Sequence, residues 1–299
     1  MLQSVRLAAE AKRRFLEEIQ EQEESGNDAP VQPRCARIAL SLGPYGATLY
    51  PAQEFDGFYP PPFGPALSTS SRSNAFDTTD EGRAQERAAV DALTAFHLER
   101  LRVFAGNREV WDAVDFVAFE TVPLRREITA IRNAVAQLQE AVGASKMKPW
   151  WISTVHPNGH YPEMRPGGGW VSTSEVVGTV LNGEGETVGA SVSPWAFGIN
   201  CTSLENLPAL LEEAEGAARG FAERYGRRPW LAMYPNRGDV YIPETQSWKK
   251  MGREGELWAR DFGDVVAETT KSGVWEGIVV GGCCKTGPDE IAGLKRHLA

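Results

Sequence analysis

Three of the four cysteines in the chain stand where predicted strands end. Cys201 closes the run at 197–201, and Cys283 and Cys284 directly follow the run at 277–282. Ligands of parallel α/β folds bind at this carboxyl edge of the sheet, because the strand-to-helix loops meet there. Three thiolates could hold one zinc ion there and leave its fourth tetrahedral position open, as in catalytic zinc sites. Burial as small packing residues is the alternative that the spacing leaves open, because no Cys-x-x-Cys pair occurs.

Zinc in such a site would serve a reaction at sulfur. The metal keeps its cysteine ligands deprotonated, and it lowers the pKa of an incoming thiol so that a thiolate nucleophile exists at neutral pH. The fourth cysteine, Cys35, opens its predicted strand at the opposite end. We therefore expect Cys35 to lie in the core rather than in the site.

Other polar residues also follow predicted strands. Glu120 comes directly after the buried run at 115–119, where a carboxylate would suit the ammonium group of an amino-acid substrate. A solvated acid at the start of a loop is an equally open interpretation. The segment 236–239 is typical of a polar turn. His156 and His160 are four residues apart in a loop rather than on a helix, so we expect no metal role for them.

The strands expected to position these residues alternate with helices. Apolar, strand-like runs occupy residues 36–43, 115–121, 150–155, 197–201, 230–234 and 277–282. Helical periodicity occupies residues 2–24, 128–142, 204–221 and 258–269, with a short last helix that begins near Pro288. This alternation predicts an α/β fold with a parallel sheet, either doubly wound or a barrel. The segments 60–82 and 158–169 are predicted to be irregular surface loops.

Composition excludes several classes of protein. The chain has 299 residues, 42% of them hydrophobic and 24% charged, which is ordinary for a globular protein. A net charge of −9 argues against nucleic acid as a partner. No apolar run is long enough to span a membrane, and the charged N-terminal segment has no signal-peptide core. Four cysteines are too few for a disulfide scaffold, so we expect a cytoplasmic protein.

Five segments carry a resemblance to a known family. They are Ala-Leu-Ser-Leu-Gly-Pro-Tyr-Gly-Ala at 39–47, Phe-Glu-Thr-Val-Pro at 119–123, Gly-Ile-Asn-Cys-Thr at 198–202, Tyr-Pro-Asn-Arg-Gly-Asp-Val-Tyr at 234–241 and Gly-Gly-Cys-Cys-Lys-Thr-Gly-Pro at 281–288. In this order, and with this combination of cysteines, the chain closely resembles the homocysteine S-methyltransferase family.

The resemblance implies a fold and a reaction. The fold is a (β/α)8 TIM-type barrel with Zn²⁺ held by Cys201, Cys283 and Cys284. The implied reaction moves a methyl group from S-methylmethionine or S-adenosylmethionine to the thiolate of homocysteine and gives methionine. In this family the position of Glu120 contacts the amino-acid part of homocysteine.

The chain departs from the family pattern at its N-terminus. The family's first strand with Asp-Gly-Gly, and its second strand ending in a Thr/Ser-Tyr-Gln type of motif, have no counterpart here. We therefore expect residues 1–299 to form one barrel domain that is N-terminally incomplete, with about six of eight strands. A partner that fills the gap is one alternative. Another is a catalytically impaired zinc-binding remnant with a non-catalytic role.

Overall fold

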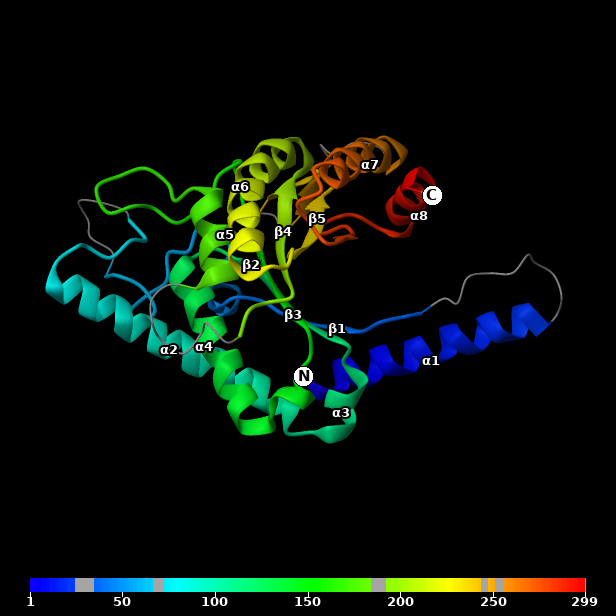
Figure 1. Cartoon of the computed structure of the whole chain (residues 1–299), viewed down its shortest axis with the longest axis horizontal. Coiled ribbons are helices and arrows are strands. Elements are labelled where there is room, and N and C mark those ends of the chain that lie inside the picture. The colour runs from blue at the N-terminus through cyan, green and yellow to red at the C-terminus, as the bar shows by residue number, and fades with distance from the viewer. Residues whose placement is uncertain (25–34, 67–72, 184–191, 243–246, 251–254, 299) are drawn as a thin grey trace.

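A six-stranded parallel sheet organises the chain (Figure 1). The computed structural model describes residues 1–24, 35–66, 73–183, 192–242, 247–250 and 255–298. In spatial order the strands are β1 (Ala39–Leu42), β2 (Phe116–Val122), β3 (Trp150–Thr154), β4 (Ala196–Ser203), β5 (Trp230–Asn236) and β8 (Ile278–Val280). All six are strands that the apolar runs predict. The predicted α/β fold with a parallel sheet is therefore confirmed.

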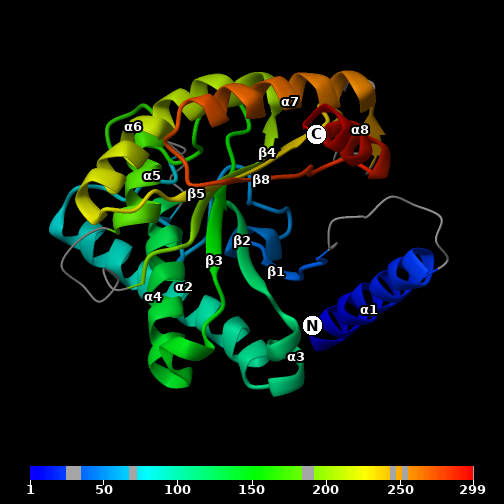
Figure 2. The ribbon, with the colours of Figure 1, turned by 45° about the vertical axis from the view of Figure 1, so that its right-hand side comes forward.

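Helices connect these strands and cover the sheet. They are α1 (Leu2–Glu24), α2 (Asp80–Ala105), α3 (Arg108–Ala113), α4 (Arg125–Val142), α5 (Thr173–Asn182), α6 (Leu207–Tyr225), α7 (Gly255–Lys271) and α8 (Pro288–Leu298). Figure 2 shows α4 to α7 along one side of the sheet, whereas α1 extends away from it beyond β1. The start of α1 packs against α3, and Val5 is buried there. None of the described helices is long and apolar enough to cross a membrane.

The two faces of the sheet differ, because successive side chains of a strand point to opposite sides. On β2, Val117 and Phe119 belong to the large core shared with the helices. Their neighbour Ala118 belongs to a smaller cluster on the other face, together with Ala196 and Ala232. This second face carries Glu120 and Tyr234 further along the strands, two residues after Ala118 and Ala232.

Aromatic rings fill the amino end of the second face. Phe116, Trp151, Trp195 and Trp230 stand at or near the starts of four neighbouring strands, and we call them the aromatic layer. The ring centroids of Trp195 and Trp230 are 4.6 Å apart, and those of Phe116 and Trp195 are 5.2 Å apart. The polar residues of the second face therefore gather at its carboxyl end, the edge at which the sequence predicts a site.

The structure departs from the sequence-based expectations in several elements. The 26-residue helix α2 and the helix α5 were not predicted, and α2 begins inside the segment expected to be a loop at 60–82. An antiparallel pair, β6 (Val240–Ile242) and β7 (Ser247–Lys249), was also not predicted. Cys35 is exposed, so the expectation that it lies in the core is wrong. The reason is that β1 begins only at Ala39, four residues later.

Candidate functional site

Two neighbouring strand ends carry irregular backbone. The β2–β3 register shifts between Phe119 and Val122, and the β4–β5 register shifts between Asn200 and Ser203. Within these stretches Thr121 has a φ of 61° and Cys201 a φ of 48°, in the left-handed region that residues other than glycine rarely adopt. Such irregularities re-aim side chains and are frequent next to active sites.

The side chain of Asn200 joins the two irregular strand ends. Its Oδ1 accepts a hydrogen bond from the backbone N–H of Thr121 at 2.9 Å, and its Nδ2 donates to Thr121 Oγ1 at 2.8 Å. The same Nδ2 lies 4.0 Å from Cys283 Sγ. One buried amide thus connects the strand of Glu120, the strand of Cys201 and the loop of Cys283.

The loop after β8 is fixed by backbone hydrogen bonds to the strand beside it. The N–H of Cys283 donates to Pro235 O at 2.9 Å, and the carbonyl of Cys284 accepts from the N–H of Arg237 at 3.1 Å. Gly282 permits the tight turn, because a Cβ there would meet Thr286 Oγ1 at 2.1 Å. The two adjacent cysteines are therefore held by a defined turn rather than by a free loop.

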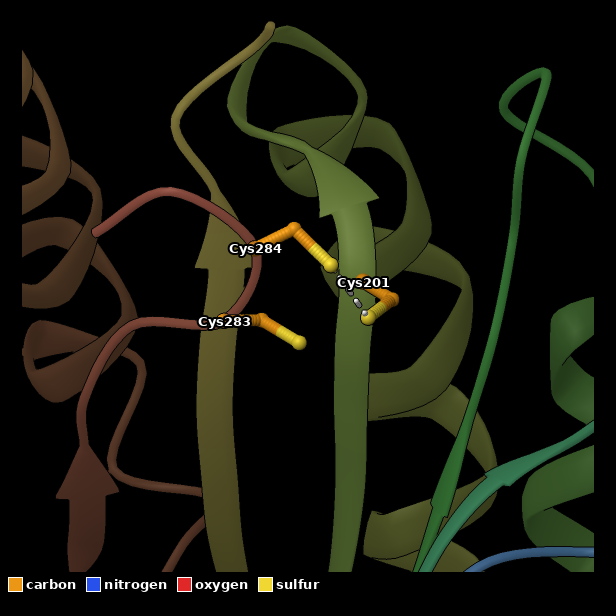
Figure 3. Close-up of side chains that lie close together, drawn as sticks. All are labelled: Cys201, Cys283 and Cys284. Atoms are coloured by element: carbon orange, nitrogen blue, oxygen red, sulfur yellow. Dashed lines mark hydrogen bonds between the residues drawn. The ribbon is translucent and has the colours of Figure 1, made fainter. Parts of the chain in front are cut away.

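These constraints bring the three predicted cysteines together (Figure 3). Their sulfur atoms all lie within 4.8 Å of one another, and those of Cys201 and Cys284 are 3.7 Å apart. Three thiolates on one tetrahedral zinc ion, with Zn–S bonds of about 2.3 Å, would be about 3.8 Å apart. All three are free thiols, since a disulfide would need sulfur atoms about 2 Å apart. The donor set fits a thiolate-binding metal ion such as zinc.

The three sulfurs also influence one another's ionisation. Hydrogen bonds from Cys201 and Cys283 lower the pKa of Cys284. Hydrogen bonding to the two neighbouring sulfurs and burial raise the pKa of Cys201. The cluster therefore favours one thiolate that its neighbours stabilise. A cation at the centre of the cluster would favour full deprotonation, because metal ligation requires thiolates.

Glu120 lies beside this cluster on the second face of the sheet. Burial raises the pKa of its carboxyl group, while hydrogen bonds from Ser41 and Tyr234 oppose the rise and the charge of Cys283 adds to it. Tyr234 in turn accepts a hydrogen bond from Trp151 Nε1 at 3.2 Å. A half-buried carboxylate near thiolates would be stabilised by a cationic group such as an ammonium.

The remaining predicted candidates take structural places. Arg237 bonds to Asp239 at 2.5 Å and to Glu290 at 3.3 Å, so this segment is a supporting turn, as its composition indicates. His156 is fully buried, and its Nε2 lies 3.1 Å from Thr154 Oγ1. Burial lowers the pKa of His156 to about 3, which keeps it neutral. Neither His156 nor His160 belongs to the metal-ligand cluster found among the described residues.

Sequence reasoning missed the residues that support the site. Asn200 and Tyr234 both lie inside segments that carry the family resemblance. Their roles, however, depend on the face of the strand that each occupies. Gly198 is a further example. A Cβ at Gly198 would meet Ser153 Oγ at 2.2 Å, and the hydroxyl of Ser153 is hydrogen-bonded to the hydroxyl of Tyr234. A period-two reading of the strands that carry Glu120, Asn200 and Tyr234 would have placed all three on one face.

The chain is similar to known homocysteine methyltransferases in sequence and in fold. The homocysteine S-methyltransferase of Escherichia coli (strain K12) is 26% identical over 258 residues, which cover 86% of this chain and 61% of the relative. Homocysteine S-methyltransferase YbgG of Bacillus subtilis (strain 168) is 27% identical over 299 residues, covering 99% of this chain and 70% of the relative. The metallated crystal structure of the homocysteine methyltransferase MmuM from E. coli is 26% identical, with a TM-score of 0.57, and covers 99% of this chain and 69% of that chain.

The fold and the thiol cluster thus define an α/β protein with a candidate metal centre at the carboxyl edge of its sheet. The sequence model of the family described as homocysteine S-methyltransferase matches residues 1–298. The chain belongs to the homocysteine S-methyltransferase family.

Proposed function

We propose that the protein transfers a methyl group from a sulfonium donor, S-methylmethionine or S-adenosylmethionine, to the sulfur of homocysteine, giving methionine. Cys201, Cys283 and Cys284 would hold a zinc ion, and Glu120 would bind the ammonium group of homocysteine. The observation that carries the proposal is the approach of three sulfurs to within 4.8 Å at the edge where Glu120 also lies.

Zinc, when bound, would keep the homocysteine sulfur deprotonated at neutral pH. The residues of the chain orient the reactants around that sulfur. The thiolate forms a new S–CH₃ bond, and the donor's S–CH₃ bond breaks with its electron pair remaining on the departing sulfur. An anion and a cation thereby become two neutral thioethers, so no general acid is needed. Positioning is the main contribution that the protein must make.

The half-buried surroundings of Glu120 support this role. Because burial disfavours its charge, Glu120 gains more from an ammonium partner than an exposed carboxylate would. Asn200 holds the Glu120 strand against the Cys201 strand and so sets the distance between the ammonium site and the reacting sulfur.

The proposal is tested on the purified chain with homocysteine and each donor, with zinc measured in the same samples. We expect about one equivalent of zinc and formation of methionine, and loss of both in Cys201→Ala. Turnover by a metal-free protein would overturn the mechanism. Zinc binding without any homocysteine-dependent change in the metal's coordination would instead favour the non-catalytic zinc-binding alternative.

We further propose that the sheet is part of a single incomplete (β/α)8 barrel, which two more strands would close between β8 and β1. Among the described residues, β1 pairs only with β2 and β8 pairs only with β5, so both are edge strands. An open edge of this kind leaves backbone groups unpaired and part of the second face uncovered. We expect low methyl transfer by the 299-residue chain and higher activity when the two family strands are added at its N-terminus. Full activity without them would contradict this domain assignment.

A further inference from the structure

A second carboxylate, Glu54, lies on the loop after β1. This loop leaves the carboxyl end of a parallel strand and therefore begins at the same edge as the thiol cluster. The backbone around Glu54 is fixed on both sides of its neighbour Gln53, whose N–H donates to Gly46 O at 2.9 Å. The carbonyl of Gln53 accepts from the N–H of Gly57 at 2.9 Å. Glu54 consequently has a defined position.

One oxygen of Glu54 is buried without a partner. Oε2 is shielded from solvent, and no described residue donates a hydrogen bond to it. A buried polar atom without a partner costs free energy, and an ion, a water or a ligand group that pairs with it would remove this cost. The side chain as a whole is only partly buried, so a ligand can approach it.

The charge of Glu54 reaches the thiol cluster. Hydrogen bonds from Cys201 and Cys283 lower the pKa of Cys284, and the negative charge of Glu54 opposes that effect. Glu120 interacts in the same way with Cys283. Each of the two adjacent cysteines therefore has a carboxylate near it. Among the described residues only the three cysteines form the metal-ligand cluster, so Glu54 is not placed as a fourth ligand.

The negative charge of the site favours a second cation besides the homocysteine ammonium. Three thiolates, a divalent ion and two carboxylates sum to about three negative charges, and the homocysteine sulfur adds another. The homocysteine ammonium compensates one of them at Glu120. A sulfonium centre is the other cation of the reaction, and it has no N–H or O–H to donate. Charge alone must recognise it, and a carboxylate oxygen without another partner can provide that charge.

We propose that Glu54 binds the sulfonium group of the methyl donor beside Cys284, while Glu120 serves homocysteine. The inference rests on the proposed function and assigns the donor half of the site. It applies to S-methylmethionine and S-adenosylmethionine alike, because both carry the same sulfonium charge.

The test compares zinc-loaded wild type with Glu54→Gln, which keeps the size of the side chain and removes its charge. We expect kcat/KM for each sulfonium donor to fall by about 10- to 100-fold, with zinc content and the KM for homocysteine unchanged. Methylation of bound homocysteine by methyl iodide, a neutral donor, should proceed equally in both proteins. Glu54→Asp retains the charge at a shorter reach and should lose less than Glu54→Gln. The exposed-helix variant Glu212→Gln controls for the change in net charge and should match wild type.

Three results would overturn the inference: unchanged donor kinetics in Glu54→Gln, a rise in the homocysteine KM instead, or an equal loss with methyl iodide. If Glu54→Gln fails to fold, Glu54→Asp is used instead. A loss of kcat/KM with the sulfonium donors but not with methyl iodide would support the inference, and an equal loss with both would overturn it. A wild-type protein that binds zinc but turns over neither sulfonium donor would overturn the proposed function, and this inference with it. Active wild type with unaffected Glu54 variants would overturn the inference alone.

Discussion

Asn200 makes two hydrogen bonds to Thr121, one to its backbone N–H at 2.9 Å and one to its hydroxyl at 2.8 Å. These bonds connect the two strand ends at which the backbone turns left-handed, and Thr121 and Cys201 are the residues that turn. The strain at both positions is thus offset by a single amide side chain. The thiol cluster and the carboxylate of Glu120 take their relative positions from this link.

Asn200→Ala should therefore weaken both the fold and the site. Loss of the amide leaves the partly buried N–H of Thr121 without its partner, so we expect the free energy of unfolding to fall by about 1–3 kcal/mol. Urea denaturation measures this change. Thr121→Val removes only the hydroxyl and should cost less. An Asn200→Ala protein as stable as wild type would show that the link does not stabilise the two strand ends.

Glu120 should make homocysteine binding depend on pH. Its pKa is raised by burial, so the carboxylate becomes protonated at a higher pH than an ordinary glutamate. The KM for homocysteine should rise as the pH falls toward that raised pKa, because a neutral carboxyl no longer attracts an ammonium. Glu120→Gln should have a high KM at every pH. A parallel pH profile in both proteins would assign the dependence to another group.

The same raised pKa affects stability in the opposite direction: a higher pH favours homocysteine binding but lowers the stability of the substrate-free fold. The folded protein without substrate holds the Glu120 proton more tightly than the unfolded chain does. Stability should therefore fall as the pH rises from the ordinary glutamate pKa through the raised one. Thermal unfolding of wild type against Glu120→Gln over this range measures the effect. An increase in the wild-type Tm over that interval, relative to the variant, would contradict the assignment.

Zinc should stabilise the folded chain through the three clustered cysteines. A ligand present at about 1,000 times its Kd adds about 4 kcal/mol to the free energy of unfolding. We expect zinc to raise the Tm of wild type and of Cys35→Ser, because Cys35 is exposed and outside the cluster. Cys284→Ala should lose most of the shift. An equal shift in Cys284→Ala would place the metal elsewhere.

Gly198 should tolerate no side chain. A Cβ there would lie 2.2 Å from Ser153 Oγ and 3.1 Å from Ala232 O, so Gly198→Ala must displace the second face of the sheet. We expect a loss of about 1–3 kcal/mol in stability. Gly216→Ala is the matched control, since nothing lies within 4 Å of its added methyl on α6. That variant should gain about 0.5–1 kcal/mol from its better helix propensity.

The sequence was sufficient to predict the strands of the sheet and the meeting of Cys201, Cys283 and Cys284 at one edge. Continuous apolar runs are typical of strands in a parallel sheet, and all six strands were found where the runs predicted. The helix α2 was missed because its polar residues lie among its apolar ones without a clear stripe, and because the preceding loop is rich in proline. Cys35 was misplaced because the apolar run begins before the strand does.

The supporting residues could not be found in the same way. Left-handed backbone at Thr121 and Cys201 arises from two strand ends meeting in space, and no local pattern predicts it. The unpaired oxygen of Glu54 belongs to a loop whose sequence contains no signal for a ligand. The role of Glu54 depends on the approach of the loop after β1 to the cysteines that follow β8, which the sequence alone does not show.

The aromatic layer has an optical consequence. Trp151 belongs to that layer, and its indole N–H reaches the hydroxyl of Tyr234, which also bonds to Glu120. A change in the charge or occupancy of Glu120 is thus transmitted to an indole ring through two contacts. We therefore expect the fluorescence of Trp151 to respond to ligand binding at Glu120.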